Sequence, residues 1–451
     1  MRFHLGKPVL VMLLIAVVTG TAVALRPRPR DSDLHVWVFA DAHARTYRSI
    51  QPQFERTTGR SLDIDLVTNA ALNMRLTSLI LAGGQGERPP DAVEIEIGSI
   101  GRYFGLSTDR VGFLPLNDRL ANSGWMDRIV RSRFAPWTKE GVIFGVPHDV
   151  HPVTITYRHD LFSEAGVDLE AAETWPKFQS LCLQFQRYWR SRGYVDRHAM
   201  ELPLAAADNI VVMLVQRRVN LVDDYDRLHL RDPRVAHTVA FYARMVAGPD
   251  RIGAESAGGR GVWTTDLVAG NVCAVVTPDW KLNDLKTYAP ALAGKMRMMP
   301  LPRFDPADAR TSTWGGTMIG IPRHAKDPDA SWKLIEFLYL SDAGVDARVA
   351  QSTILPPLPE HFHRPEYQQP DPYFGGQKVD ALYAELAAEI PPRYMSPLTI
   401  GAQMAISVTL SRATDYLRDH GSEGLEAKCA EWLALAEQDL LKRLAHAEAG
   451  G

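Results

Sequence analysis

Along residues 34–97, segments in which apolar residues recur with a period of two alternate with segments in which they recur at helical spacing. Period-two segments, which predict β-strands, span residues 34–39, 61–67 and 91–97, and helical spacing spans residues 42–58 and 72–82. Asp41 precedes the first helix and can cap it, and Gly59 ends it. Because strands and helices alternate, this region predicts βαβ units and a parallel α/β sheet.

The rest of the chain has a more helical pattern. Helices are expected at residues 175–192, 208–219, 233–246, 329–339, 379–390 and 401–447, and strands at 272–276 and 311–321. A proline-rich connection spans residues 355–372. The glycine-rich segment 253–261 has the spacing of neither a phosphate-binding loop nor a dinucleotide fingerprint, so no nucleotide site is predicted there.

Residues 141–175 contain the most informative interruption of the apolar pattern. Apolar, β-rich segments at 143–146 and 153–157 flank a polar break that contains His148, Asp149 and His151, with Pro147 and Pro152 at its edges. Each proline removes a backbone donor, so the two prolines are expected to bracket a break in strand pairing. Two interpretations follow: an ordinary surface turn, or a chain crossing between two domains beside a ligand cleft.

The N-terminus has the pattern of an export signal. Arg2 and Lys7 precede an apolar run over residues 8–18, and small residues end at Ala24, where cleavage is predicted. The uncharged run over residues 8–25 is also just long enough to span a bilayer, and three arginines follow it at positions 26, 28 and 30. A cleaved signal over residues 1–24 and an uncleaved anchor therefore both remain open.

Composition narrows the class of protein. At 451 residues and 46% hydrophobic content, the chain can form two or three domains with sizeable cores. The net charge is −3 and basic residues are spread along the chain, which argues against nucleic-acid binding. Cys182, Cys273 and Cys429 have no CxxC partner, so we expect three buried thiols, with one disulfide and one thiol as the alternative.

Several motifs in a fixed order resemble a known family. They are LHVWVFADAHARTYRSIQPQFERTTG from residue 34, PPDAVEIEIGSIGRYF followed by GFLPLNDRL, the segment 141–175, VCAVVTPDW, the PLP of residues 300–302, and TWGGTMIGIPRHAKDPDASWKLIEFL. Together they resemble the extracellular solute-binding proteins of ABC importers, the group of the maltose-binding and multiple-sugar-binding proteins. The chain departs from the family pattern at Arg158, where asparagine is common, and it lacks the lipid-attachment cysteine of many Gram-positive members.

The resemblance implies an α/β, two-lobe periplasmic-binding-protein fold of type II, with a helical C-terminal part. Each lobe would be a sheet flanked by helices. After a spacer at residues 25–33, lobe 1 would comprise residues 34–147 and 316–356, and lobe 2 residues 152–312 and 376–447. Hinge crossings would lie near residues 148–152, 312–316 and 356–375.

The resemblance also implies a function. The chain would capture a sugar or oligosaccharide in an interlobe cleft and present it to the permease subunits of an ABC importer, which contact the ATPase in turn. It would be a periplasmic monomer, tethered if the anchor stays uncleaved. It would have no cofactor, no metal and no enzymatic activity.

Family resemblance and position at strand ends select the candidate ligand contacts. Trp280 matches the family's aromatic platform, and Asp149 is the preferred polar contact in the first crossing, beside His148 and His151. Trp314 precedes Gly315 and Gly316, whose missing side chains would let a ligand approach the backbone. Asp41, Glu96, Ser99 and Tyr394 complete the set. Asp41 has a helix cap as its alternative role, and Trp280 a place in the core.

Three other functions are weighed against this one. An exported carbohydrate hydrolase needs two carboxylates across a scissile bond, and Glu94 with Glu96 is the only close pair at a strand end. One strand cannot flank a bond from two sides, which counts against it. His361 and His363 form a histidine pair that could bind a metal. A sensor ectodomain of the same fold would require the uncleaved anchor.

Overall fold

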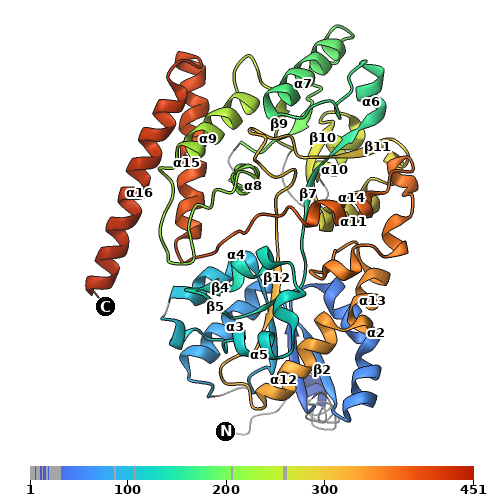
Figure 1. Cartoon of the computed structure of the whole chain (residues 1–451), viewed down its shortest axis with the longest axis vertical. Helices are drawn as coiled ribbons and strands as arrows, with labels where there is room; N and C mark the ends of the chain where they lie inside the picture. The colour runs from blue at the N-terminus through green and yellow to red at the C-terminus, as the bar shows by residue number, and fades with distance from the viewer. Residues whose placement is uncertain are drawn as a thin grey trace.

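The computed structural model shows two lobes, each built on its own β-sheet and joined by chain crossings (Figure 1). It describes residues 32–85, 88–105, 107–204, 207–256 and 262–450, with a few isolated positions before residue 32. The predicted cleavage site after Ala24 and its flanking arginines lie outside the described residues. Within the described part, no helix combines the length and the apolar character needed to cross a membrane.

The first lobe contains a five-stranded sheet in the order β2-β1-β3-β12-β6. Its strands are β1 (Leu34–Val38), β2 (Leu62–Leu66), β3 (Ala92–Glu96), β6 (Val146–Pro147) and β12 (Thr317–Gly320). β1 pairs in parallel with β2 and β3, which confirms the predicted βαβ opening. β12 runs antiparallel to β3 and β6, so the sheet is mixed rather than parallel throughout.

Helices cover the first sheet as the sequence pattern predicts. They are α2 (Asp41–Thr58), α3 (Asn69–Leu81), α4 (Ile97–Ile100), α5 (Asn117–Asn122), α12 (Pro328–Ile335) and α13 (Asp342–Gln351), with a π-helical turn at Glu336–Leu340. Gly59 has a φ of 68° and ends α2, as expected. Ala40, not Asp41, is the N-cap of α2, because the backbone becomes helical at Asp41 itself. A small antiparallel pair, β4 (Thr138–Lys139) and β5 (Val142–Ile143), flanks this lobe.

The second lobe contains a three-stranded sheet in the order β10-β7-β11. Its strands are β7 (Val153–Arg158), β10 (Ala274–Pro278) and β11 (Met296–Pro300), and both pairings are antiparallel. The parallel pairing predicted for residues 34–97 does not extend to this lobe. All six residues of β7 are buried, and β10 and β11 pair with its two edges. A short parallel pair, β8 (Met200–Glu201) with β9 (Gly253–Ala254), lies in the same lobe.

Most of the second lobe is helical. Its helices are α6 (His159–Glu164), α7 (Trp175–Arg190), α8 (Asp208–Gln216), α9 (Pro233–Val246), α10 (Val262–Ala269), α11 (Asp279–Tyr288), α14 (Val379–Ala387), α15 (Thr399–His420) and α16 (Leu425–Gly450). Thr174 caps α7 by accepting a hydrogen bond from the Lys177 backbone. α15 and α16 pack on α9 and form the outer edge of the lobe (Figure 1).

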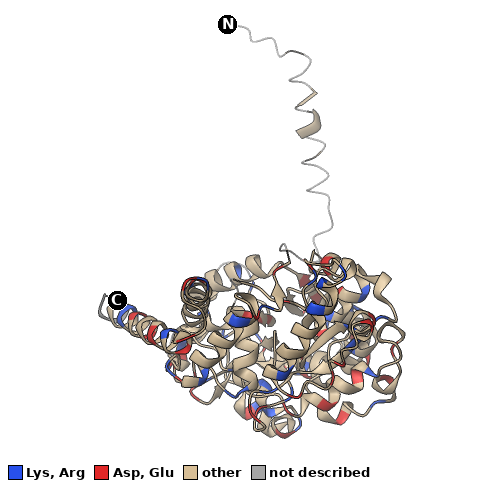
Figure 2. Cartoon of the chain, turned by 90° about the horizontal axis from the view of Figure 1, so that it is seen from above, with Lys and Arg blue, Asp and Glu red and all other residues tan. Residues whose placement is uncertain are grey.

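The cysteines and the surface charge agree with expectation. All three cysteines are free and buried. Basic and acidic residues are interspersed over the molecule, as the small net charge suggests (Figure 2).

Two of the crossings between the lobes run side by side. The first, between β6 and β7, is the polar break of residues 148–152, and the second enters β12 from residues 311–316. Pro152 and Thr313 form an antiparallel bridge between them. A third passage follows α13, where the Val150 amide donates to the Leu355 carbonyl. The polar interruption is therefore a crossing and not a surface turn.

Candidate functional site

A cavity of about 410 Å³ lies between the two lobes, next to the crossings; we call it the interlobe cavity. The ends of β1 and β3, the crossings, and the first turns of α8, α11 and α15 all contribute to its wall. Its lining residues are Phe39, Ala40, His43, Glu96, Ile97, Gly98, His151, Asp208, Trp280, Trp314, Gly315, Gly316, Thr317, Ile354, Arg393, Met395, Thr399, Ile400 and Gln403. Six of the predicted site residues are among them: Glu96, His151, Trp280, Trp314, Gly315 and Gly316.

Two tryptophans form the aromatic part of the wall. Trp280 is the second residue of α11, and its Nε1 donates to the Trp314 carbonyl oxygen at 2.9 Å. The two rings lie edge to face with centroids 6.1 Å apart. The Lys281 Nζ lies 4.5 Å from the centre of the Trp314 ring. Both tryptophans are half-buried, so each ring is held in place and still keeps an accessible part.

Charged side chains from both lobes surround these rings. Glu96, at the end of β3, caps α4 by accepting from the Gly98 backbone at 2.8 Å. Burial raises the pKa of its carboxyl. Asp208 begins α8 on the opposite side. The cavity thus offers carboxylate acceptors next to flat apolar faces.

Arg393 is the cation of the cavity, and sequence reasoning missed it. Its side chain is 8% exposed, and burial lowers its pKa against the opposing effect of Asp208 and Glu96. Within the described part of the chain, the Arg393 guanidinium has no hydrogen bond and no ion pair. The guanidinium nitrogens are not among the buried unpaired atoms of the described residues, so they keep access to the interlobe cavity and can donate to a ligand acceptor there. The only sequence signal is its place next to Tyr394, which was predicted instead.

Asp149 lies outside the interlobe cavity, contrary to its predicted role as a ligand contact. It is fully buried and accepts from Arg133 Nη2 at 2.9 Å and from the Thr317 amide at 3.0 Å. The His151 Nε2 lies 3.1 Å from Asp149 Oδ2, the oxygen that also accepts from the Thr317 amide. The carboxylate therefore has a full set of protein partners and connects the first two crossings.

His151 extends this network into the second lobe. Its Nδ1 lies 2.5 Å from an oxygen of Asp279, and the second oxygen of Asp279 accepts from the Leu355 amide at 3.0 Å. Arg133 adds a hydrogen bond to the Thr313 hydroxyl at 2.7 Å. All three passages between the lobes are thus joined through buried charges. The edge of the His151 ring still reaches the interlobe cavity.

The remaining predicted residues have structural partners elsewhere. His148 is buried against the His43 ring, with centroids 4.0 Å apart, and Ser99 accepts from Asn73 Nδ2 at 3.1 Å behind α4. Asp41 is exposed and forms an ion pair with Arg45 one turn later. Tyr394 lines a different cavity, of about 600 Å³, that contains Met126. None of these four is among the residues that line the interlobe cavity.

The glycine pair is explained by packing of the protein. Gly315 and Gly316 have φ values of 96° and 151°, which side-chain-bearing residues rarely adopt. A Cβ on Gly315 would lie 3.1 Å from Trp280 Nε1, and one on Gly316 would lie 2.7 Å from Arg133 Nη2. The missing side chains therefore make room for Trp280 and Arg133, although both glycines also line the cavity.

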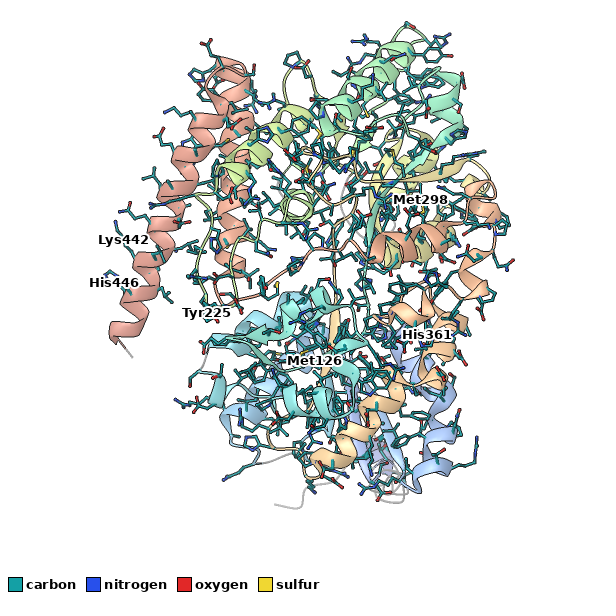
Figure 3. All side chains as sticks on the ribbon, viewed as in Figure 1. Met126, Tyr225, Met298, His361, Lys442 and His446 are labelled. Carbon is teal, nitrogen blue, oxygen red and sulfur yellow. The ribbon has the colours of Figure 1, made fainter. Side chains whose placement is uncertain are left out.

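The carboxylate pair proposed for a hydrolase does not face a common space. Glu94 is fully buried and accepts from Tyr47 at 2.7 Å and from Tyr339 at 2.6 Å, and it lies 2.9 Å from His43 Nδ1. Glu96, two residues later, lines the cavity. The histidine pair has no third ligand either: His361 lies beside α13 (Figure 3), 3.8 Å from Asp342, and the one three-ligand group found among the described residues is His35, Asp63 and Asp65.

Comparison with known sequences identifies relatives over most of the chain. Residues 40–345 match the family described as bacterial extracellular solute-binding protein. An arabinooligosaccharide-binding protein of Halalkalibacterium halodurans is 23% identical over 365 residues, which cover 78% of each chain. A lactose-binding protein of Rhizobium radiobacter is 23% identical over 316 residues, which cover 69% of this chain and 71% of that protein.

Solved structures share the fold. The sugar-binding protein MalE of Xanthomonas citri superposes with a TM-score of 0.71 at 18% identity, covering 93% of this chain and all of that one. The binding protein of a Bifidobacterium (B. animalis) ABC transporter in complex with β-1,6-galactobiose gives 0.64 at 19% identity, over 91% and 98% of the two chains. The family match spans well over half of the sequence. The chain belongs to the bacterial extracellular solute-binding protein family.

Proposed function

We propose that this protein binds a sugar or oligosaccharide in the interlobe cavity and presents it to the permease of an ABC importer. The observation that carries the proposal is the pairing of two fixed tryptophan faces with Glu96, Asp208 and Arg393 in one cavity. Sugars present C–H groups on their ring faces and hydroxyls around their rims. Aromatic rings suit the faces, and charged hydrogen-bonding groups suit the hydroxyls.

The printed functions of the relatives support the same class of ligand. Two of them bind arabinooligosaccharides or lactose, and one solved neighbour holds β-1,6-galactobiose. A ligand that contacts both lobes at once would favour a closed arrangement, because it interacts better with that state than with an open one. In this proposal lobe 1 comprises residues 34–147 and 316–356, lobe 2 comprises residues 152–312 and 376–447, and the hinges lie near residues 148–152, 312–316 and 356–375.

The same proposal includes the location, the oligomeric state and the partners of the protein. It acts outside the cytoplasm after export by its N-terminal segment, as a monomer that binds without catalysing a reaction. Its partners are the transmembrane subunits of the permease, and through them the ATPase.

A thermal-shift screen tests the ligand class. Arabinobiose, lactose and β-1,6-galactobiose are compared with spermidine, a tripeptide and glycerophosphocholine, because a ligand of the folded state raises the melting temperature as its concentration exceeds Kd. We expect a shift with at least one carbohydrate and none with the other compounds. A shift only with a non-carbohydrate would refute the sugar assignment and leave the family unchanged.

A further inference from the structure

A second hollow of about 480 Å³ opens beside the interlobe cavity; we call it the side chamber. The two spaces share four lining residues: Gly98, Met395, Thr399 and Ile400. Gly101 lets the segment after Arg393 come close to the first lobe, since a Cβ there would lie 2.4 Å from the Ser396 carbonyl oxygen. The chamber therefore adjoins the proposed sugar site along these residues.

The chemistry of the side chamber differs from that of the interlobe cavity. Its lining includes the apolar side chains of Ile80, Leu81, Met395, Pro397 and Ile400. Among its described lining residues there is no carboxylate and no side-chain amide, and the exposed Arg102 is the one charged side chain. A space of this kind offers few partners to a further sugar ring.

Three hydroxyl groups in the side chamber have protein partners. The Tyr103 hydroxyl donates to Asn73 Oδ1 at 2.8 Å, and the Thr399 hydroxyl accepts from the Ser396 amide at 2.9 Å. The Ser396 hydroxyl accepts in turn from the Leu398 amide at 3.2 Å. What the chamber presents to a ligand is mainly apolar surface.

Apolar side chains continue outward from the chamber. Ile400, Met404 and Val408 lie four residues apart on one face of α15 and are 59%, 62% and 50% exposed. Leu81, at the end of α3 across the mouth, is 81% exposed. Contiguous exposed apolar residues mark binding surfaces more often than chance.

We propose that the ligand is an amphiphilic glycoside, with its sugar in the interlobe cavity and an alkyl or aryl aglycone in the side chamber. This inference rests on the proposed function, because the sugar must occupy the adjoining cavity. Met395 and Ile400 line both spaces, so a ligand in the interlobe cavity has the chamber directly beside it. Each methylene of the aglycone that is buried strengthens binding about fourfold.

Titration calorimetry with matched glycosides tests this inference. Methyl and hexyl β-lactoside, and methyl and hexyl α-L-arabinofuranoside, are titrated into the protein below any micelle concentration. We expect the hexyl form to bind about tenfold more tightly than the methyl form of the same sugar, since burial of two of its five extra methylenes suffices. Equal affinities would overturn the chamber assignment and leave the proposed function standing. Binding of no glycoside in either form would overturn both.

The variant Leu81→Asp tests whether the tighter binding of the hexyl form arises in the side chamber. Met74→Asp is its matched control. Both residues are exposed on α3, and Met74 lines neither space. Leu81→Asp should remove most of the hexyl advantage and leave the affinity for methyl glycosides unchanged, whereas Met74→Asp should change neither. If both variants keep the advantage, the hexyl group binds elsewhere and the inference fails. If Leu81→Asp lowers the affinity for the methyl and hexyl forms equally, Leu81 acts on closure of the lobes and not on the aglycone. That result also refutes the inference.

Discussion

His151 in the first crossing binds Asp279 at the start of α11, with 2.5 Å between Nδ1 and the carboxylate oxygen, while its Nε2 faces Asp149 at 3.1 Å. One imidazole thus joins two buried carboxylates from different parts of the chain. Its backbone has a φ of 54°, an unusual value that the surrounding contacts hold in place. The lobes are connected through a buried ionic network and not only through the backbone.

This relationship predicts how stability depends on pH. Burial acts to lower the pKa of His151, but Asp149 and Asp279 outweigh it and raise the pKa from 6.5 to about 9. Between these values the folded protein keeps a proton that the unfolded chain releases, so the free energy of unfolding falls as pH rises from 6.5 to 9. The loss is about 3 kcal/mol at most. Urea unfolding at pH 6.5, 8 and 9.5 measures it.

The slope reverses on the acid side. Burial, with Arg348 and His43 nearby, lowers the pKa of His148 well below 6.5, so the unfolded chain takes up a proton there that the folded protein does not. Stability therefore declines again as pH falls below 6.5.

His151→Gln should remove the decline in stability above pH 6.5, and the exposed His229→Gln should leave the dependence of stability on pH unchanged. A decline that survives in His151→Gln would assign it to another group.

Arg133 and Arg393 are both buried arginines, and we expect opposite effects on substitution. Arg133 bonds to Asp149 and Thr313, so Arg133→Met should leave a buried carboxylate without its partner and lower stability by about 3 to 5 kcal/mol. Arg393 has no such partner among the described residues, so Arg393→Met should leave the melting temperature unchanged or higher. It should instead weaken carbohydrate binding at least tenfold. Melting curves and calorimetry on both variants check this, and a large loss of stability in Arg393→Met would contradict it.

The sequence pattern predicted local structure better than it predicted pairing. Alternation and helical spacing placed β1, α2 and β2, because these depend on neighbouring residues. The apolar pattern did not predict the strand directions in the second sheet, because a buried strand such as β7 has the same pattern in a parallel and an antiparallel sheet. Pairing of β12 with β3 joins residues more than two hundred positions apart.

The site shows the same division. Trp280 and Glu96 follow strands directly, so their position at a sheet end was visible in the sequence. The sequence does not distinguish Asp149 from a ligand contact, because its partners Arg133 and the Thr317 amide come from distant segments. Apart from its place next to Tyr394, Arg393 carries no local signal, because its burial is a property of the assembled lobes.

Glu94 and Glu96 on one strand allow a matched test of stability against binding. Glu94→Gln should lower stability by about 1 to 3 kcal/mol, because the buried carboxylate accepts two tyrosine hydroxyls, and should leave carbohydrate affinity unchanged. Glu96→Gln should instead weaken carbohydrate affinity and leave stability nearly unchanged. Because burial raises the pKa of Glu96, wild-type affinity should also weaken as pH falls toward that raised pKa, where the carboxylate gains a proton. Loss of affinity in Glu94→Gln alone would place the ligand elsewhere.

Trp280→Ala provides the most direct test of the interlobe cavity. The ring packs edge to face on Trp314 and donates one hydrogen bond to its carbonyl, so its removal should cost modest stability and leave the fold intact. It should abolish the fluorescence change that accompanies carbohydrate binding and weaken affinity at least tenfold, because the sugar face loses its aromatic partner. Trp432→Ala on α16, where the ring contacts Tyr416, is the matched control and should keep both signals. If Trp280→Ala collapses the fold as judged by circular dichroism, the ring belongs to the core. If it folds and binds carbohydrate normally, the ligand lies away from these tryptophans.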